Sequence, residues 1–137
     1  MDKSRIRISE CGLRSEKMNV NKQDLKERTK RFALKVIKLV ETLPRGRTAD
    51  ILGRQLLSAG TSVGANYRAA CRARSTADFI SKMGIVEEET DETIYWVELL
   101  IDSALVHKED VNRLLDEANQ LLAITVSSIR TARRNKK

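Results

Sequence analysis

The sequence predicts an all-α protein, an antiparallel up-down-up-down bundle of four helices. Its 137 residues are 41% hydrophobic and 33% charged but only 4% aromatic, with one Pro and six Gly, which favours helices over a turn-rich β architecture. Apolar residues recur at three-, four- and seven-residue spacings in four stretches, and the short connections between them favour antiparallel neighbours. The length fits one domain with a single core.

The first two helices are separated by the only proline. The first is expected over about residues 22–43 and ends at Pro44 and Gly46. Its apolar stripe consists of Leu25, Phe32, Val36, Leu39, Val40 and Leu43. Thr48 is expected to cap the second helix, over about 48–73. The stripe of that helix consists of Leu52, Leu56, Ala59, Val63, Tyr67 and Ala70.

The third helix is expected to be the longest, and the fourth follows it after a short connection. Ser75 and Asp78 have the spacing of a capping box and predict a third helix over about 76–106. Its core face consists of Phe79, Met83, Val86, Thr90, Ile94, Val97, Ile101 and Ala104. The fourth helix is expected over about 109–131, which completes a bundle domain of residues 22–130. Its stripe consists of Val111, Leu114, Leu115, Ala118, Leu121, Leu122, Thr125 and Ile129.

The second helix carries Gly60 and Gly64, four residues apart, among small neighbours. Glycine weakens a helix interior by about 1 kcal/mol relative to alanine, so this pair predicts an unusually close approach of another helix. The spacing does not match a phosphate-binding loop, and no Lys follows it.

Carboxylates are concentrated in the run Glu87-Glu88-Glu89-Thr90-Asp91-Glu92. In an antiparallel pair of the second and third helices this run faces Ser58, Ser62 and, within a turn, Arg54. We therefore expect its acids to be paired or hydrogen-bonded beside the core. A di-metal site would need Glu-x-x-His motifs from two helices, whereas the one histidine, His107, falls in a connection.

No catalytic, metal or cofactor site is expected. Cys11 and Cys71 are far apart and have no zinc-ligand spacing, and Cys71 has no histidine partner that would activate it as a nucleophile. A hydrolase that uses Cys71 or Glu88 is the disfavoured alternative. No stretch has the length of a signal-peptide core or of a membrane span, so the cytoplasm is the expected compartment.

Three helices carry more apolar surface than one core-facing stripe needs. The excess residues are Leu34 and Ile37 in the first helix, residues 94–101 in the third, and Ile124 and Val126 in the fourth. A single bundle leaves its outer faces in water, so we expect self-association. The alternative is that these are scattered surface residues of the ordinary kind.

Positive charge is expected to gather at one end of the bundle. The formal charge is +7, although residues 75–118 alone carry −9. An up-down-up-down order brings together a basic segment 1–21, expected to be flexible, the end of the second helix, and a basic tail 131–137. The predicted nucleic-acid-binding residues at this pole are Arg68, Arg72, Arg74, Arg130, Arg133, Arg134, Lys136 and Lys137. Alternatively, these side chains offset helix dipoles and aid solubility.

Residues 55–100, QLLSAGTSVGANYRAACRARSTADFISKMGIVEEETDETIYWVELL, resemble the signature of a bacterial four-helix-bundle family encoded in ribosomal-RNA intervening sequences. The most specific segments are GTSVGANY at 60–67, RARS at 72–75 and DETIYW at 91–96, and the resemblance covers about residues 22–130. This family is also similar to the accessory variability determinant of diversity-generating retroelements.

The resemblance implies a homopentameric barrel of four-helix bundles. The similarity to the retroelement protein implies binding of nucleic acid and a reverse transcriptase through basic surfaces. Only Arg68, Arg72 and Arg74 lie in the matching motif and take over that role residue by residue.

We therefore expect a non-enzymatic, oligomeric accessory protein that binds RNA or DNA through its basic pole. Because no aromatic platform interleaves the charges, contacts to phosphates are expected rather than readout of bases. The alternative is a protein-interaction scaffold or adaptor that does not bind nucleic acid. The expected partners are further copies of the chain, nucleic acid, and a reverse transcriptase or another protein, with no membrane.

Overall fold

A computed structural model describes residues 22–135 as four helices without a strand. These helices are α1 (Lys22–Glu41), α2 (Arg47–Cys71), α3 (Thr76–Asp102) and α4 (Lys108–Arg134). The predicted all-α fold with four helices is confirmed. Segment 1–21 and the two lysines of the tail, Lys136 and Lys137, lie outside the described residues.

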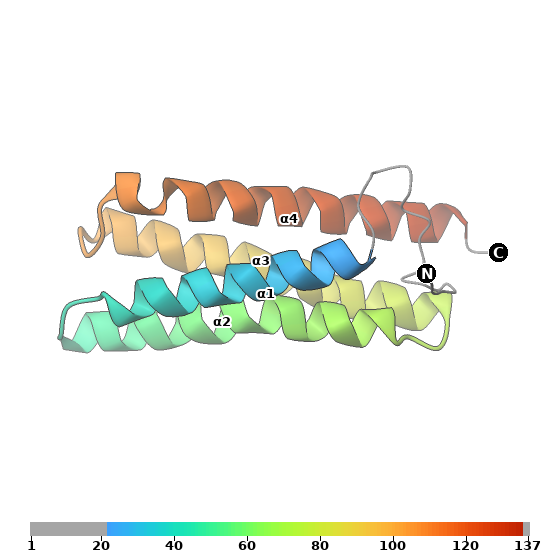
Figure 1. The fold of residues 1–137 in the computed structure, drawn as a ribbon, viewed down its shortest axis with the longest axis horizontal. Coiled ribbons are helices and arrows are strands. Elements are labelled where there is room, and N and C mark those ends of the chain that lie inside the picture. The colour runs from blue at the N-terminus through green and yellow to red at the C-terminus, as the bar shows by residue number, and fades with distance from the viewer. Residues whose placement is uncertain (1–21, 136–137) are drawn as a thin grey trace.

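The four helices lie side by side with their long axes in roughly one direction (Figure 1). The α1–α2 and α3–α4 connections lie at one end, and the α2–α3 connection and the last turn of α4 lie at the other. α2 packs between α1 and α3, α4 packs on α3, and α1 and α4 share the smallest of the four contacts. α1 and α3 therefore occupy opposite corners of the molecule.

The core is built from the predicted apolar stripes. Fully buried side chains include Phe32 and Val36 of α1, Leu56 and Val63 of α2, Met83, Val86, Val97 and Leu100 of α3, and Val111 of α4. Ile94 and Ile101 pack on this core at its edge and are half-buried, and Ala104 is exposed. One contiguous cluster thus runs through all four helices, which explains why periodicity alone located them.

The start of α2 differs from the prediction, whereas the start of α3 agrees with it. α2 begins at Arg47 after Gly46, whose φ of 152° only glycine adopts readily, so the predicted cap at Thr48 is wrong. The Gly46 carbonyl instead accepts the first helical bond from the Asp50 N–H at 2.9 Å. Ser75 caps α3 as predicted, and its Oγ accepts from the Asp78 N–H at 3.0 Å.

α3 ends at Asp102, four residues before the predicted end at 106, because a Schellman motif terminates it. Ala104 adopts a left-handed conformation with φ 63°, and its N–H donates to the Ile101 carbonyl at 2.9 Å. The Leu105 N–H donates to the Leu100 carbonyl at 2.9 Å, and the half-buried Leu105 packs back onto the core. Glycine usually occupies the left-handed position, so an alanine there gave no stop signal in the sequence.

α4 continues through Arg134, so the first part of the segment predicted as a tail from residue 131 is helical. Ala132 packs against the core cluster, which ties the last turn to the bundle. No glycine or proline interrupts this stretch, so the helix continues as long as it finds apolar contact.

The close helix approach predicted from the glycines of α2 is confirmed, and the partner is α1. A Cβ added to Gly60 would lie 2.8 Å from both Cγ atoms of Val36, and one added to Gly64 would lie 3.0 Å from Oγ1 of Thr29. The Thr29 hydroxyl donates to the Leu25 carbonyl at 2.8 Å, so this buried polar group is satisfied within its own helix.

No helix among the described residues is long and apolar enough to cross a membrane.

Candidate nucleic-acid interface

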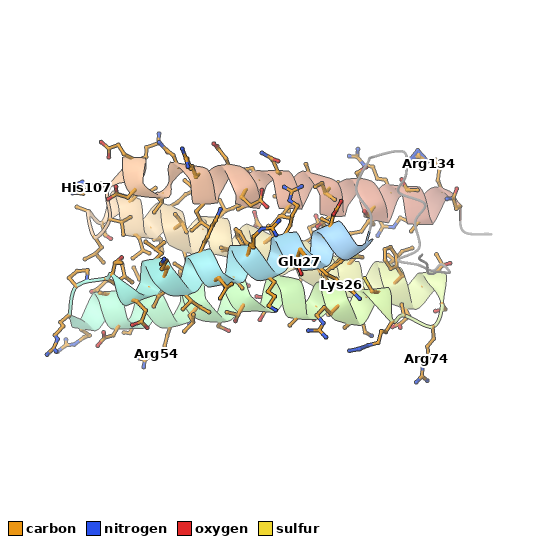
Figure 2. All side chains as sticks on the ribbon, in the orientation of Figure 1. Lys26, Glu27, Arg54, Arg74, His107 and Arg134 are labelled. Atoms are coloured by element: carbon orange, nitrogen blue, oxygen red, sulfur yellow. The ribbon has the colours of Figure 1, made fainter. Side chains whose placement is uncertain are left out.

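The ends of α2 and α4 bring six of the eight predicted arginines and lysines to one end of the bundle. Arg74, in the α2–α3 connection, and Arg134, in the last turn of α4, lie at this same end on opposite edges of the molecule (Figure 2). We call this group the basic pole. Its members are Arg68, Arg72, Arg74, Arg130, Arg133 and Arg134.

All six guanidinium groups of the basic pole are exposed, and within residues 22–135 none of them forms an ion pair. The nearby carboxylate of Asp78 is already engaged. Lys82 Nζ donates to its Oδ1 at 2.9 Å, and the Arg74 backbone N–H donates to its Oδ2 at 3.3 Å. The Lys82 bond, followed by the Arg74 N–H, holds the pKa of Asp78 below its usual value. Asp78 therefore forms its ion pair with Lys82 rather than with a guanidinium group of the pole.

Part of this charge has a structural role. Both α2 and α4 end at the pole, and cations near a helix C-terminus are favourable because they oppose the negative end of the helix dipole. The last turn of α2 is closed by backbone bonds, since the Arg72 N–H donates to the Ala69 carbonyl and the Ala73 N–H donates to the Ala70 carbonyl, each at 3.0 Å. The guanidinium groups are therefore not required as caps and remain available to a ligand.

The prediction that the acids of residues 87–92 are paired beside the core is wrong. Glu88, Asp91 and Glu92 are exposed, and the run has no basic partner among the described residues, Arg54 included. Only Thr90 of this run is fully buried, because six consecutive helical residues point in all directions and one of them falls on the core side. The Thr90 hydroxyl donates to the Val86 carbonyl at 2.7 Å.

The outcome is an acidic surface on α3 that is separate from the basic pole. Glu89 is half-buried, and this desolvation, followed by the neighbouring charges of Glu92 and Glu88, raises the pKa of its carboxyl group. The raised pKa of Glu89 therefore reflects partial burial first and the repulsion of neighbouring carboxylates second.

An ion pair between α1 and α4 had no signal in the sequence. Arg28 donates from Nη2 to Glu117 Oε1 at 2.7 Å and from Nε to Oε2 at 3.0 Å, and it also reaches Gln120 Oε1 at 3.2 Å. Glu117 raises the pKa of Arg28 through this bond more than partial burial lowers it. The two residues are 89 positions apart, and each is one of many charged residues in the chain, so no spacing could have indicated the pair.

Several large apolar side chains are exposed, as the excess of apolar residues predicted. The exposed fraction is 55% for Leu34, 38% for Ile37, 50% for Ile51, 39% for Ile85 and 52% for Tyr95. The exposure of Ile51 and Ile85 was not predicted, because each directly precedes a residue of a predicted core stripe, Leu52 and Val86 respectively. Conversely, Ile124 and Val126 are half-buried.

Two of the three aromatic residues of α3 form a pair at the edge of the core. The rings of Tyr95 and Trp96 meet edge to face with centroids 5.0 Å apart. Trp96 Nε1 is buried, and no described residue accepts its hydrogen.

Among the described residues, no three His, Cys, Asp or Glu side chains are grouped so that they could hold a metal ion.

These features define a small all-helical protein whose distinguishing surfaces are a basic pole and an acidic helix face. Residues 21–127 match the family model of the 23S rRNA-intervening sequence protein, and the chain belongs to that family. A crystal structure of a protein of unknown function from the S23 ribosomal protein family of Bacteroides thetaiotaomicron VPI-5482 has the same fold. It is 32% identical to this chain with a TM-score of 0.74, over 80% of this chain and 97% of the other. None of the curated proteins matches this chain.

Proposed function

We propose that this chain is the subunit of a non-enzymatic, oligomeric accessory protein that binds RNA or DNA through its basic pole. Its antiparallel up-down-up-down bundle would assemble into a barrel, for which the resemblance noted above implies five copies. The observation that carries the proposal is the basic pole itself, where six exposed guanidinium groups from α2, the α2–α3 connection and α4 lack ion-pair partners among residues 22–135.

One guanidinium group can donate two parallel hydrogen bonds to the oxygens of a phosphate. A cluster of such groups is therefore suited to a nucleic-acid backbone. Base stacking has no platform at this end, because Tyr67 and Phe79 are buried and Tyr95 lies on the acidic helix. Contacts at the pole would therefore position a backbone or read its shape rather than its sequence. The acidic surface of α3 would repel phosphates and favour approach from the pole.

Salt-titrated binding to structured RNA and to duplex DNA tests this proposal. The family name refers to 23S rRNA, so an rRNA hairpin is a suitable first probe. We expect the logarithm of the binding constant to fall linearly with the logarithm of the salt concentration. Arg74→Gln and Arg134→Gln are each expected to reduce the size of that slope by roughly 1, as for one lost phosphate contact.

Arg54→Gln is the matched control, because Arg54 is exposed on α2 but lies away from the pole (Figure 2). Its slope is expected to equal that of the unmodified protein. Absence of binding even at low salt, or an equal loss in the control, would reject the proposal. In that case the exposed apolar residues favour the second candidate, a protein-interaction scaffold or adaptor.

The proposed partners are nucleic acid, further copies of the chain and, as the resemblance implies, a reverse transcriptase or another protein. We expect this function in the cytoplasm.

A further inference from the structure

The outer face of α1 combines exposed apolar side chains with positive charge. Leu34 and Ile37 are exposed on it, one turn apart. The exposed basic side chains around them are Lys30, Arg31, Lys35 and Lys38, of which Arg31 pairs with Glu27 at 3.7 Å within the helix. α1 as a whole carries seven basic and three acidic residues. We call this the α1 face.

The outer face of α3 has the same design with the opposite charge. Ile85, Glu88, Glu92 and Tyr95 are all exposed and follow one another at spacings of three, four and three residues, so they share one side of the helix. α3 carries eight acidic residues and one basic residue, and that one, Lys82, is paired with Asp78. We call this the α3 face.

The two faces lie at the same height along the bundle and point away from each other. Val36 packs against Gly60, which lies 11 residues before the end of α2, and Glu87 lies 11 residues after the start of α3. α2 and α3 run in opposite directions (Figure 1). Equal counts from their shared connection therefore place Val36 and Glu87 at nearly the same level. Residues 34–37 are then level with residues 85–88, on a helix that runs in the same direction at the opposite corner.

We infer that the α1 face of one copy docks against the α3 face of the next copy. The two copies then lie side by side and use different surfaces, which is a heterologous contact. This inference rests on the self-association within the proposed function and names the surfaces that would produce it. A rotation about an axis parallel to the helices preserves height, so it brings Leu34 and Ile37 beside Ile85 and Glu88 of the next copy. It also places lysines of α1 opposite carboxylates of α3, where each compensates the other.

Charge complementarity selects a second copy as the occupant of both faces. A face of one sign repels a copy of itself, so α1–α1 and α3–α3 contacts are disfavoured, whereas α1–α3 contacts are favoured. When copies join through two different faces, the first copy of the row keeps one unpaired face and the last copy keeps the other. If the rotation from copy to copy brings these two unpaired faces together, the copies form a closed ring. All basic poles then point to the same side of the ring, where a nucleic-acid backbone could contact several of them.

Two double variants test the pairing of the faces. Leu34→Glu with Ile37→Glu adds acid to the α1 face, and Ile85→Lys with Tyr95→Lys adds base to the α3 face. Each variant alone is expected to be monomeric by sedimentation at a concentration where the unmodified protein is assembled. An equal mixture is expected to form dimers, because one intact α1 face and one intact α3 face remain between the two variants.

Ile51→Glu is the control, since Ile51 is equally exposed on α2 but belongs to neither face. It should leave the assembled mass unchanged. Circular dichroism and thermal melting report whether the variants fold. The exposed charge changes Lys38→Glu and Glu92→Lys provide a second test, in which each weakens assembly at low salt by about tenfold or more and the two together restore it.

Three results would overturn the inference: an unmodified protein that is monomeric at tens of micromolar, a double variant that keeps the full assembled mass, or a mixture that stays monomeric. Both double variants retain the six arginines of the pole. Salt-dependent nucleic-acid binding without assembly would therefore reject this contact and leave the binding proposal standing. Assembly through these faces without nucleic-acid binding would support the contact and reject the binding proposal.

Discussion

Gly60 keeps α1 and α2 close together, because the space that its side chain would fill is occupied by Val36. Gly60→Ala would place a Cβ at 2.8 Å from both Cγ atoms of this β-branched neighbour, and neither helix can give way without disturbing the core. Overpacking typically costs about 1–3 kcal/mol and the better helix propensity of alanine returns up to about 1 kcal/mol. We expect a net loss of about 1–2 kcal/mol in the free energy of unfolding by urea.

Gly84 of α3 provides the matched control for that substitution. It also lies inside a helix, but a Cβ added there would meet no atom within 4 Å beyond its chain neighbours and the backbone of its own helix. Gly84→Ala is therefore expected to stabilise the protein by about 0.5–1 kcal/mol through the lower entropy of the unfolded chain. The two substitutions are compared at one protein concentration. Equal effects at both positions would show that the α1–α2 approach does not constrain Gly60.

The left-handed conformation of Ala104 at the end of α3 is unfavourable in free energy, because a φ of 63° brings its Cβ close to the neighbouring backbone. Glycine adopts this conformation without that cost and would keep both hydrogen bonds of the Schellman motif. Ala104→Gly is expected to raise the free energy of unfolding by roughly 0.5–1 kcal/mol. Ala123→Gly, at an exposed position inside α4, should instead lower it by about 1 kcal/mol.

At the scale of the element, α3 differs from the other helices because it combines a complete core stripe with an uncompensated acidic surface. Glu89 reports on that surface, since desolvation and the charges of Glu92 and Glu88 raise its pKa. A carboxyl group whose pKa is higher in the folded chain than in the unfolded chain binds protons more tightly when folded. Folding is therefore favoured as pH falls through that raised value, and the gain is complete below the ordinary value of glutamate.

Glu89→Gln removes this titration and is expected to stabilise the protein at neutral pH. The advantage over the unmodified protein should shrink as pH falls through the raised pKa and vanish below the ordinary one, as followed by thermal melting across that range. Glu98→Gln is the control, because Glu98 is exposed on the same helix and is not among the charges that shift Glu89. A constant difference between Glu89→Gln and the unmodified protein at all pH values would contradict the argument.

Helix positions could be predicted from the sequence because each helix buries one periodic stripe, whereas helix ends depend on single backbone conformations. The φ angles of Gly46 and Ala104 decide where α2 begins and where α3 ends. Residue type indicates such angles only in part, since the left-handed position of α3 is filled by alanine. The ends of helices were therefore the least predictable part of the elements.

At the scale of the whole molecule, the position of the basic pole followed from topology alone. Arg74, after the end of α2, and Arg134, in the last turn of α4, share one end of the molecule, as the predicted up-down-up-down order requires (Figure 2). Pairwise contacts were not predictable in this way. The Arg28–Glu117 pair joins residues that are distant in the sequence, and the expected partner of the acidic run, Arg54, does not contact it.

The proposed ring predicts that assembly strengthens nucleic-acid binding. Each copy would contribute one basic pole, so a ligand that spans several copies would make more phosphate contacts than a single copy allows, and binding of the second pole would become intramolecular. The Leu34→Glu, Ile37→Glu variant keeps every arginine of the pole but should lose these additional contacts. We expect its affinity for a long RNA duplex to fall by about a hundredfold or more at low salt.

The slope of affinity against salt should also become shallower in that variant, since the slope scales with the number of phosphates contacted. An RNA hairpin too short to reach a second pole is the control ligand, and the variant should bind it with nearly the same slope as the unmodified protein. Ile51→Glu should bind both ligands as the unmodified protein does. If the monomeric variant bound the long duplex with an unchanged slope, a single pole would already provide all the contacts, and the ring would have no part in binding.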